Sequence, residues 1–194
     1  MGKAVVISGT PGVGKTLVAT LLASRLSLNY VNLSDLVVKE SLYLGFDKTR
    51  GSFIVDEDRL VKRLTELLSE SESDIVVDSH YGEIIPDELV RAIFVLRLNP
   101  AVLYETLSLR GWSSEKVREN VEAEILGVCT YNAVSEHPAS KVCEIDVTNK
   151  KADEVVEEIL GVLNNTKKCE VGIDWTTQES LQDFITKLLS TLQQ

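Results

Sequence analysis

Short apolar runs alternate along the chain with longer segments whose apolar residues recur every three or four positions. The runs cover residues 3–8, 29–32, 74–78, 92–98 and 141–147, each the length of a buried strand. Helical patterns cover residues 14–26, 34–43, 56–68, 100–109, 114–134 and 152–163. Every connection between successive strands is long enough for a parallel crossover. The pattern therefore predicts an α/β fold around a five-stranded parallel sheet.

Details of the helices follow from the same pattern. The first helix is expected to turn Leu17, Leu21, Leu22 and Leu26 inward. Ser34 and Asp35 are plausible N-caps for the next helix, and Gly45 and Gly51 indicate a loop after it.

Beyond residue 163 the chain changes character. Residues 164–168 form a polar linker, and residues 176–192 have the pattern of an amphipathic helix. Its apolar stripe contains Leu181, Phe184, Ile185, Leu188 and Leu189. We expect this helix to dock on the body of the protein or on a partner.

The chain of 194 residues carries 20 Lys and Arg against 30 Asp and Glu, so its formal charge is 20 − 30 = −10. A pI near 4.8 argues against general nucleic-acid binding, which needs a basic face. No apolar run approaches the roughly 18 residues of a membrane span, and no secretory signal is visible. We expect a protein of the cytoplasm, without a membrane partner, or also of the nucleus if the source is a eukaryote.

The three cysteines are Cys129, Cys143 and Cys169, 14 and 26 residues apart. This spacing matches no zinc site, and an odd number does not suit a disulfide framework. All three are expected to be free thiols, packed as small hydrophobic side chains.

A phosphate-binding loop is predicted at residues 9–16, where the sequence GTPGVGKT fits G-x-x-x-x-G-K-[ST]. Gly12 and Gly14 let backbone N–H groups surround phosphate oxygens, and Lys15 adds a positive charge. The Thr16 hydroxyl would complete a Mg²⁺ site. A glycine turn with an incidental lysine is the alternative, but the loop lies directly between a predicted strand and a predicted helix.

Charge is unevenly distributed in a way that suits this loop. Residues 1–34 contain three basic residues and no acid, so all 30 carboxylates lie beyond them. Carboxylates near a bound phosphate would oppose its binding. The sequence therefore separates a phosphate-facing start from an acidic remainder.

Asp78 and His80 follow the third predicted strand. An acid at such a strand tip holds Mg²⁺ through its water molecules in P-loop kinases and hydrolases, and Asp78 is the candidate. His80 could act as base, proton shuttle or positioning group for an attacking water or a phosphate. The alternatives are a turn cap for Asp78 and a histidine held by backbone hydrogen bonds.

A series of motifs resembles the adenylate kinase isoenzyme 6 family, small nucleoside-monophosphate-kinase-like ATPases linked to ribosome biogenesis and rRNA processing. The resemblance extends over about residues 1–163. Its motifs are GTPGVGK (9–15), YVNLSDL (30–36), LYLGFD (42–47), VDEDR (55–59), VVDSH (76–80), FVLR (94–97), LYETLSLRGW (103–112) and VEAEI (121–125).

The resemblance implies a P-loop kinase core over residues 1–163 with strand order 2-3-1-4-5. It implies a monophosphate-binding insert at about 32–55 and a short lid at about 109–119, leaving residues 164–194 as an appendage. Arg110 would be the lid arginine that reaches ATP and assists catalysis, Leu17 would also contact the nucleotide, and Lys150 would lie where the family contacts adenine.

The site for AMP is where this sequence departs from ordinary adenylate kinases. Gly82 stands where those enzymes have an arginine that grips the AMP phosphate, and Val38 stands where the family often has another. The remaining candidates for AMP contacts are Asp35, Lys39, Arg50 and Arg59. Most surface Lys and Arg are merely solvated, so this set is the weakest part of the predicted site.

Two function classes follow. The first is an enzyme that uses ATP and Mg²⁺ to phosphorylate AMP, with ATPase activity when AMP is absent, in which Lys15, Asp78, His80 and Arg110 carry the catalysis. The second is a nucleotide-switched, chaperone-like binder of a basic ribosomal protein of the small-subunit platform, with indirect RNA contact in a pre-ribosomal particle. A kinase for another small metabolite shares the loop but explains the other motifs less well.

Overall fold

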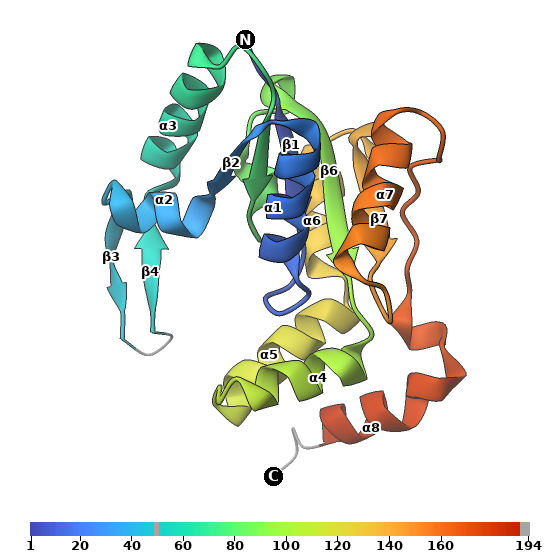
Figure 1. Cartoon of the computed structure of the whole chain (residues 1–194). Coiled ribbons are helices and arrows are strands. Elements are labelled where there is room, and N and C mark those ends of the chain that lie inside the picture. Colours follow the sequence, from blue (N-terminus) through green and yellow to red (C-terminus); the bar gives the residue numbers. More distant parts are fainter. Residues whose placement is uncertain (49–50, 191–194) are drawn as a thin grey trace.

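A five-stranded parallel sheet forms the centre of the molecule (Figure 1), in a computed structural model that describes residues 1–48 and 51–190 apart from the side chain of Leu189. Its strands are β1 (Ala4–Ser8), β2 (Asn29–Asn32), β5 (Ile75–Asp78), β6 (Val90–Arg97) and β7 (Val142–Asp146). The predicted α/β class and parallel sheet are confirmed. The order is β2-β5-β1-β6-β7, which is 2-3-1-4-5 when only these five strands are counted; the labels differ because a separate hairpin supplies β3 and β4.

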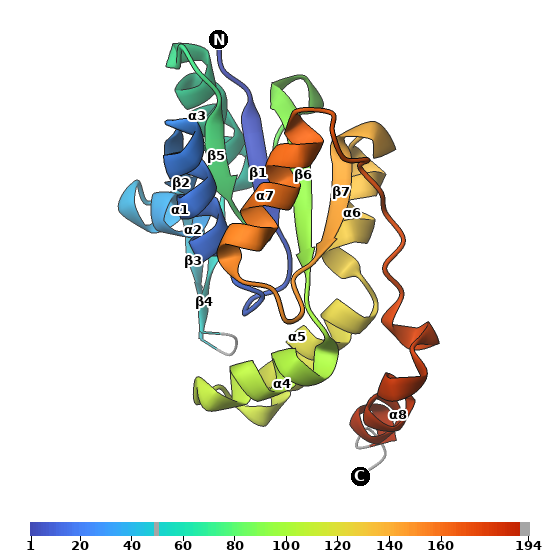
Figure 2. The same ribbon diagram turned by 45° about the vertical axis from the view of Figure 1, so that its right-hand side comes forward.

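Helices cover both faces of the sheet because successive residues of its buried strands point to opposite sides. Val5 and Ile7 of β1 join the apolar cluster that includes α1 (Lys15–Leu26) and α7 (Ala152–Leu163). Ala4 and Val6 face the cluster built with α3 (Glu57–Glu70) and α6 (Val128–Glu136). Figure 2 shows α1 and α7 in front of the sheet and α6 behind it. Among the described residues, no helix is both long and apolar enough to cross a membrane.

Side-chain caps fix where several helices begin. Asn32 caps α2 (Leu33–Lys39) by accepting a hydrogen bond from the Asp35 N–H, so the N-caps expected at Ser34 and Asp35 were wrong. Asp56 caps α3, and Asn99 caps α4 (Pro100–Leu109). Up to β7 the chain also forms α5 (Ser114–Ile125) and the short 3₁₀ turns η1 (Gly82–Ile84), η2 (Asp87–Leu89) and η3 (Ala139–Lys141).

The insert after α2 differs from the prediction. The helix ends at Lys39, because Ser41 takes a left-handed conformation (φ 53°) and the Leu42 N–H bonds back to the Val37 carbonyl. A β-hairpin follows, formed by β3 (Tyr43–Asp47) and β4 (Ser52–Val55), where a helix end and a loop were expected. The Tyr43, Phe46 and Phe53 rings pack on one another and stabilise it.

Two further helix predictions need correction. The pattern over residues 114–134 divides into α5 and α6 at Gly127, whose φ of 64° starts a new helix in a new direction. Leu17 was expected to face inward, but it is 64% exposed on α1. Leu22 is fully buried, while Leu21 and Leu26 pack at the edge of the same core.

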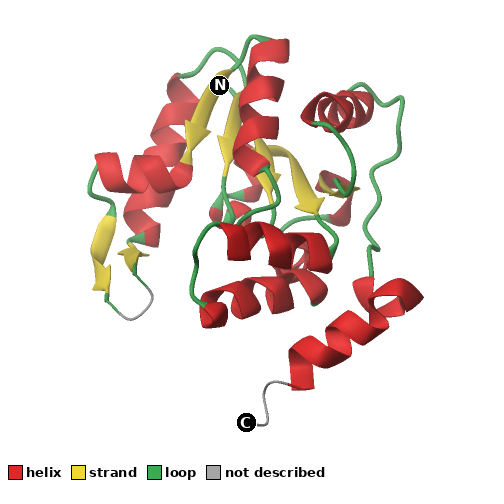
Figure 3. Ribbon diagram, turned by 60° about the horizontal axis from the view of Figure 1, so that its bottom comes forward, coloured by secondary structure: helices red, strands yellow, loops and turns green. Residues whose placement is uncertain are grey.

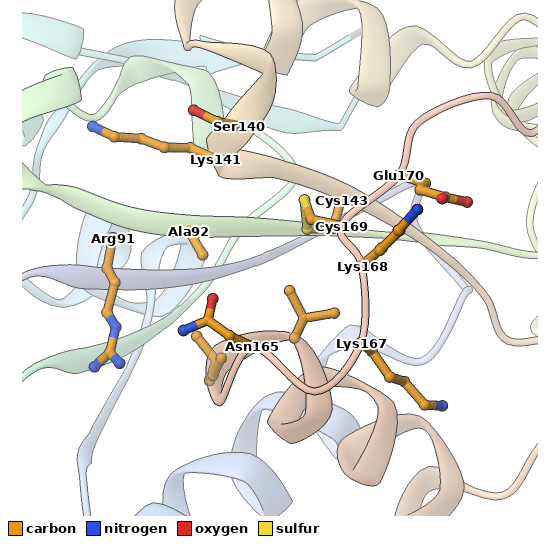
Figure 4. A pocket seen from close by; sticks show the side chains of 12 residues that line it. Arg91, Ala92, Ser140, Lys141, Cys143, Asn165, Lys167, Lys168, Cys169 and Glu170 are labelled. Carbon is orange, nitrogen blue, oxygen red and sulfur yellow. A yellow bond between two sulfur atoms is a disulfide. The ribbon is translucent and has the colours of Figure 1, made fainter.

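A disulfide joins Cys143 of β7 to Cys169, so the prediction of three free thiols holds only for Cys129. After α7 the chain reverses and runs beside β7, where the Glu144 N–H donates to the Glu170 carbonyl. This return, which spacing alone does not reveal, brings the two Cα atoms to 4.9 Å. Figure 4 shows the disulfide in the wall of a cavity of about 430 Å³.

The appended helix docks on the body of the protein, which was one of the two expected outcomes. It is shorter than predicted: the 3₁₀ turns η4 (Trp175–Thr177) and η5 (Glu179–Leu181) precede α8 (Gln182–Ser190), and Leu192 lies outside the described residues. Leu181, Ile185 and Leu188 are buried, and Phe184 contacts Tyr104 of α4 edge-on. Figure 3 shows that an extended segment carries the chain to α8.

Three buried charges lie where β6, β7, α5 and the C-terminal segment meet. We call Arg97, Glu124 and Glu144 the Arg97 cluster; each side chain is at most 3% exposed. Arg97 Nε donates to Glu124 Oε1 at 2.8 Å, and its Nη1 pairs with Glu144 Oε1. Burial raises the pKa of the Glu144 carboxyl, but hydrogen bonds from Thr130, Gly172 and Ile173 and the charge of Arg97 outweigh it and hold that pKa below its usual value.

The disulfide makes a testable contribution to stability. It closes a loop of 26 residues, so Cys169→Ser should lower the free energy of unfolding by about 3 kcal/mol through the gain in unfolded-chain entropy. Urea unfolding with and without a reductant measures this. The reductant should destabilise the wild type and the Cys129→Ser control alike and leave Cys169→Ser unchanged. A wild type with equal stability in both conditions would contradict the prediction.

Candidate active site

The phosphate loop joins the end of β1 to the start of α1, at the carboxyl edge of the sheet (Figure 1). Gly12 and Gly14 have φ values of 102° and 97°, which favour glycine. Gly14 is also the N-cap of α1, whose first turn contains no acidic residue. The loop therefore has the glycine conformations and the adjoining positive end of a helix dipole that an anion-binding loop requires.

Lys15 lies within this loop. Its Nζ donates to the Thr10 carbonyl oxygen at 3.1 Å, so the ammonium group folds back over the loop. The pKa of Lys15 lies below its usual value, mainly because the side chain is buried. The charges of Asp78, Cys129 and Glu124 oppose this shift, and that of nearby Arg110 adds to it. A bound phosphate would favour the charged form of this side chain.

Asp78 and Thr16 meet directly although 62 residues separate them in sequence. Thr16 Oγ1 donates to Asp78 Oδ2 at 2.6 Å, and the same oxygen accepts bonds from Asn32 Nδ2 at 2.8 Å and the Tyr30 hydroxyl at 3.0 Å. Asp78 is 2% exposed. Three neutral donors thus stabilise a buried carboxylate beside the phosphate loop.

This pair suits a Mg²⁺ ion bound with phosphate. All three hydrogen bonds reach Asp78 Oδ2, which leaves Oδ1 without a hydrogen bond from the described residues. Hydroxyl and carboxylate oxygens are ligands that Mg²⁺ takes, and it keeps several waters. The described residues contain no group of three or more His, Cys, Asp or Glu that could hold a metal alone, so the ion would depend on phosphate oxygens as well.

His80 follows β5 on the same edge of the sheet. Its ring packs against that of Tyr81, with centroids 3.5 Å apart and the ring planes tilted by 45°. Burial and the charge of Lys15 lower the pKa of His80 to about 4, although Asp78 opposes the shift. The imidazole is therefore neutral at pH 7, a weak base that can still accept a hydrogen bond.

The other residues expected to contact ATP lie in three different settings. Arg110, the C-cap of α4, is exposed, and its guanidinium has no hydrogen-bond or ion-pair partner within the described part of the chain. Leu17 is exposed on the first turn of α1. Lys150 lies after β7, and its Nζ pairs with Glu158 at 2.7 Å. Of these residues, Arg110 is the one whose charge acts on Lys15.

The described residues that were expected to bind AMP lie on α2 and α3, outside the phosphate loop. Asp35 and Lys39 are exposed on α2, and Arg50 lies outside the described residues. Arg59 Nη1 donates to the Ser41 carbonyl at 3.0 Å, so it stabilises the turn before the hairpin. No hydrogen bond between described residues links any of them to Lys15 or Asp78.

Gly82, which stands where ordinary adenylate kinases have an arginine, lies too close to the sheet for a side chain. A Cβ atom there would lie 2.8 Å from Val6 Cγ1 of β1, closer than van der Waals contact allows. η1 therefore packs on the sheet without space for a side chain at this position. A cationic side chain that contacts an AMP phosphate would therefore have to come from another position.

Sequence reasoning missed the residues that orient the site. Tyr30 and Asn32 bond to Asp78, while Thr10 Oγ1 donates to Glu124 Oε2 at 2.7 Å. Tyr30 and Asn32 lie two residues apart on β2, so both side chains are on the same face of that strand. β2 pairs with β5, and Asn32 is in register with Asp78. That spacing was visible in the sequence, but the pairing of the two strands was needed to interpret it.

Comparisons with known proteins agree with this geometry. Residues 5–127 match the family model described as "AAA domain". A protein of Saccharolobus islandicus named "Putative adenylate kinase" is 38% identical over 184 residues, which cover 95% of this chain and 93% of that protein. A protein of the same name from Pyrococcus abyssi is 40% identical over 173 residues, covering 89% and 91% of the two chains.

A likeness to solved structures concerns the fold. Shikimate kinase from Acinetobacter baumannii superposes with a TM-score of 0.57 at 15% identity, covering 86% of this chain and 96% of that one. The shared architecture is that of small P-loop kinases. On the combined evidence of the motif, the fold and these relatives, the chain belongs to the family of P-loop kinase enzymes that includes the archaeal adenylate kinases.

Proposed function

We propose that the protein is a Mg²⁺-dependent adenylate kinase that transfers the γ-phosphoryl group of ATP to AMP, forming two ADP, and to water when AMP is absent. One observation carries this proposal: the 2.6 Å contact between Thr16 of the phosphate loop and Asp78 at the tip of β5. It places a hydroxyl, a carboxylate and an anion-binding loop at one point. The names of the curated relatives support the choice of ATP and AMP.

Positioning and charge neutralisation carry the reaction in this proposal. The loop N–H groups hold the phosphates of ATP, and Lys15 and Arg110 balance the charge that spreads over the transferred group. Thr16 and Asp78 would hold Mg²⁺, Asp78 through water, and the ion would supply charge neutralisation between phosphate oxygens. Leu17 and Lys150 would contact the nucleotide, the latter after exchanging its bond to Glu158 for one to adenine.

His80 would act where water replaces AMP. Its imidazole is neutral at pH 7, so it can position an attacking water molecule by accepting a hydrogen bond, while a pKa of about 4 makes it a weak base. It lies two residues after Asp78 and feels the charges of both Lys15 and Asp78, which keeps it at the phosphate end of the site. This placement supports an ATPase activity besides the kinase activity.

The acceptor would bind between two small units of the 1–163 core. We assign residues 32–55, which include α2 and the hairpin, as the monophosphate-binding insert, and residues 109–119 as the lid. Asp35, Lys39, Arg50 and Arg59 are the proposed AMP contacts. Lys39 is exposed and free of polar partners among the described residues, whereas Arg59 would have to leave the Ser41 carbonyl.

A matched pair of variants tests the site. Thr16→Val removes the hydroxyl at nearly constant volume and should lower the rate of ADP formation from ATP and AMP about 100-fold. Thr16→Ser keeps the hydroxyl and should retain most of the rate, and EDTA should abolish the rate in all forms. A coupled assay for ADP, run with and without AMP, measures each case. Equal rates in Thr16→Val and Thr16→Ser would contradict the assignment.

A second proposal concerns the partner. Beyond residue 34 the chain has 17 basic residues against 30 acidic ones, a surface that attracts a basic protein. We propose that this cytoplasmic enzyme serves small-ribosomal-subunit maturation by binding a basic ribosomal protein of the platform, with nucleotide controlling the complex. Contact with RNA in the pre-ribosomal particle would then be indirect.

Binding to such a ribosomal protein should be strong at low salt and weaken steeply as salt rises, because screening removes the attraction between exposed charges. Co-purification over a salt series, with and without ATP, measures this. Asp78→Ala and His80→Ala should change the effect of ATP while leaving the salt dependence intact. Absence of binding at low salt would reject the partner and leave the kinase proposal standing.

A further inference from the structure

A series of hydrogen bonds, buried except at its last link, connects the C-terminal segment to the phosphate loop. Trp175 of η4 is 1% exposed, and its indole Nε1 donates to Glu124 Oε1 at 3.0 Å. The other oxygen of that carboxylate, Oε2, accepts the 2.7 Å bond from the Thr10 hydroxyl. The Thr10 carbonyl in turn accepts the 3.1 Å bond from Lys15 Nζ. Direct contacts therefore connect Trp175 to Glu124, Glu124 to Thr10, and Thr10 to Lys15.

Glu124 can hold only one orientation in this setting. Its Oε1 also accepts bonds from Arg97 Nε at 2.8 Å and the Leu98 N–H at 3.2 Å, and the side chain is 1% exposed. A buried carboxylate with four donors from three segments of the chain is held by the protein and not by water. Removing one donor changes the balance that directs Oε2 at Thr10.

The C-terminal segment supports the same cluster at a second point. The Gly172 and Ile173 N–H groups each donate to Glu144 Oε2 at 2.7 Å, and Glu144 pairs with Arg97. Arg97 also lies 5.9 Å from the centroid of the Trp175 ring. The disulfide at Cys169 tethers the segment just before these contacts. Residues 172–175 therefore close the Arg97 cluster rather than lie loosely on the surface.

We infer that Glu124 is a positioning residue through which Trp175 of the C-terminal segment sets the conformation of the phosphate loop. Glu124 does not touch the reacting atoms; it acts through Thr10, whose carbonyl anchors the Lys15 ammonium. The appendage is then a working part of the nucleotide site, although it lies outside the motifs of the phosphate loop and the strand tips. The inference rests on the proposed function, because its kinetic readout is phosphoryl transfer.

Variants that remove single donors test this inference. Trp175→Phe keeps a ring in the core but removes the N–H, and Thr10→Val removes the hydroxyl; each should weaken MgATP binding and lower kcat about five- to tenfold. Thr10→Ser should restore both quantities. The Thr10→Val/Trp175→Phe double variant should be no worse than the more impaired single variant, because both changes break the same chain of contacts.

Leu181→Ala is the matched control, since Leu181 is a buried residue of the same segment, is 3% exposed, and lies outside the hydrogen-bonded chain. It should lower Tm without changing MgATP affinity or kcat. Calorimetric Kd values for MgATP and thermal unfolding are measured for every variant below its Tm. Multiplicative effects in the double variant, or a kinetic loss in Leu181→Ala equal to that in Trp175→Phe, would overturn the inference.

The two proposals fail separately in this design. A wild type that binds MgATP but does not phosphorylate AMP contradicts the proposed function, while the Kd series still decides the role of Glu124. Active enzyme whose MgATP Kd and kcat are unchanged by Thr10→Val and Trp175→Phe contradicts the inference and leaves the kinase assignment in place.

Discussion

The buried ion pair between Arg97 and Glu124 is the interaction on which much of the rest depends. Both side chains are nearly inaccessible, and Arg97 is the cation that both Glu124 and Glu144 pair with, so its loss would leave two buried carboxylates uncompensated, at a cost of about 3–5 kcal/mol. The pair joins the end of β6 to α5, and its remaining hydrogen-bonding groups reach the phosphate loop and the C-terminal segment. One electrostatic constraint therefore connects the core, the nucleotide site and the appendage.

Parallel strand pairing supplies the geometry of the site itself. Because the strands run in one direction, the ends of β1, β2 and β5 lie at the same edge of the sheet. The phosphate loop extends β1, while Asn32 and Asp78 end their strands in register with each other. The contact of Thr16 with Asp78 follows from this arrangement, and it brings a metal-binding pair to the loop without further elements.

The sequence predicted those features that depend on residues close to one another along the chain. Periodicity predicted the strands, and the spacing of glycine, lysine and carboxylate residues predicted the phosphate loop and the strand tip at Asp78. The structure brings this loop and Asp78 together. The Cys143–Cys169 disulfide and the bonds of Glu124 depend on chain reversals between residues distant in sequence, which periodicity does not encode. The β3–β4 hairpin was missed because it has no buried apolar face: Leu44, Phe46, Phe53 and Ile54 are all exposed. Without the alternation of a half-buried strand, this stretch was interpreted as the end of a helix and a loop.

Tracing the γ-phosphoryl group of ATP tests the central claim most directly. With ATP labelled at the γ-phosphate and AMP in excess, the kinase proposal predicts that the label moves into the β-phosphate of newly formed ADP, with little released as inorganic phosphate. With AMP omitted, the same label should appear slowly as inorganic phosphate. Release of labelled phosphate at one rate, whether or not AMP is present, would contradict the account.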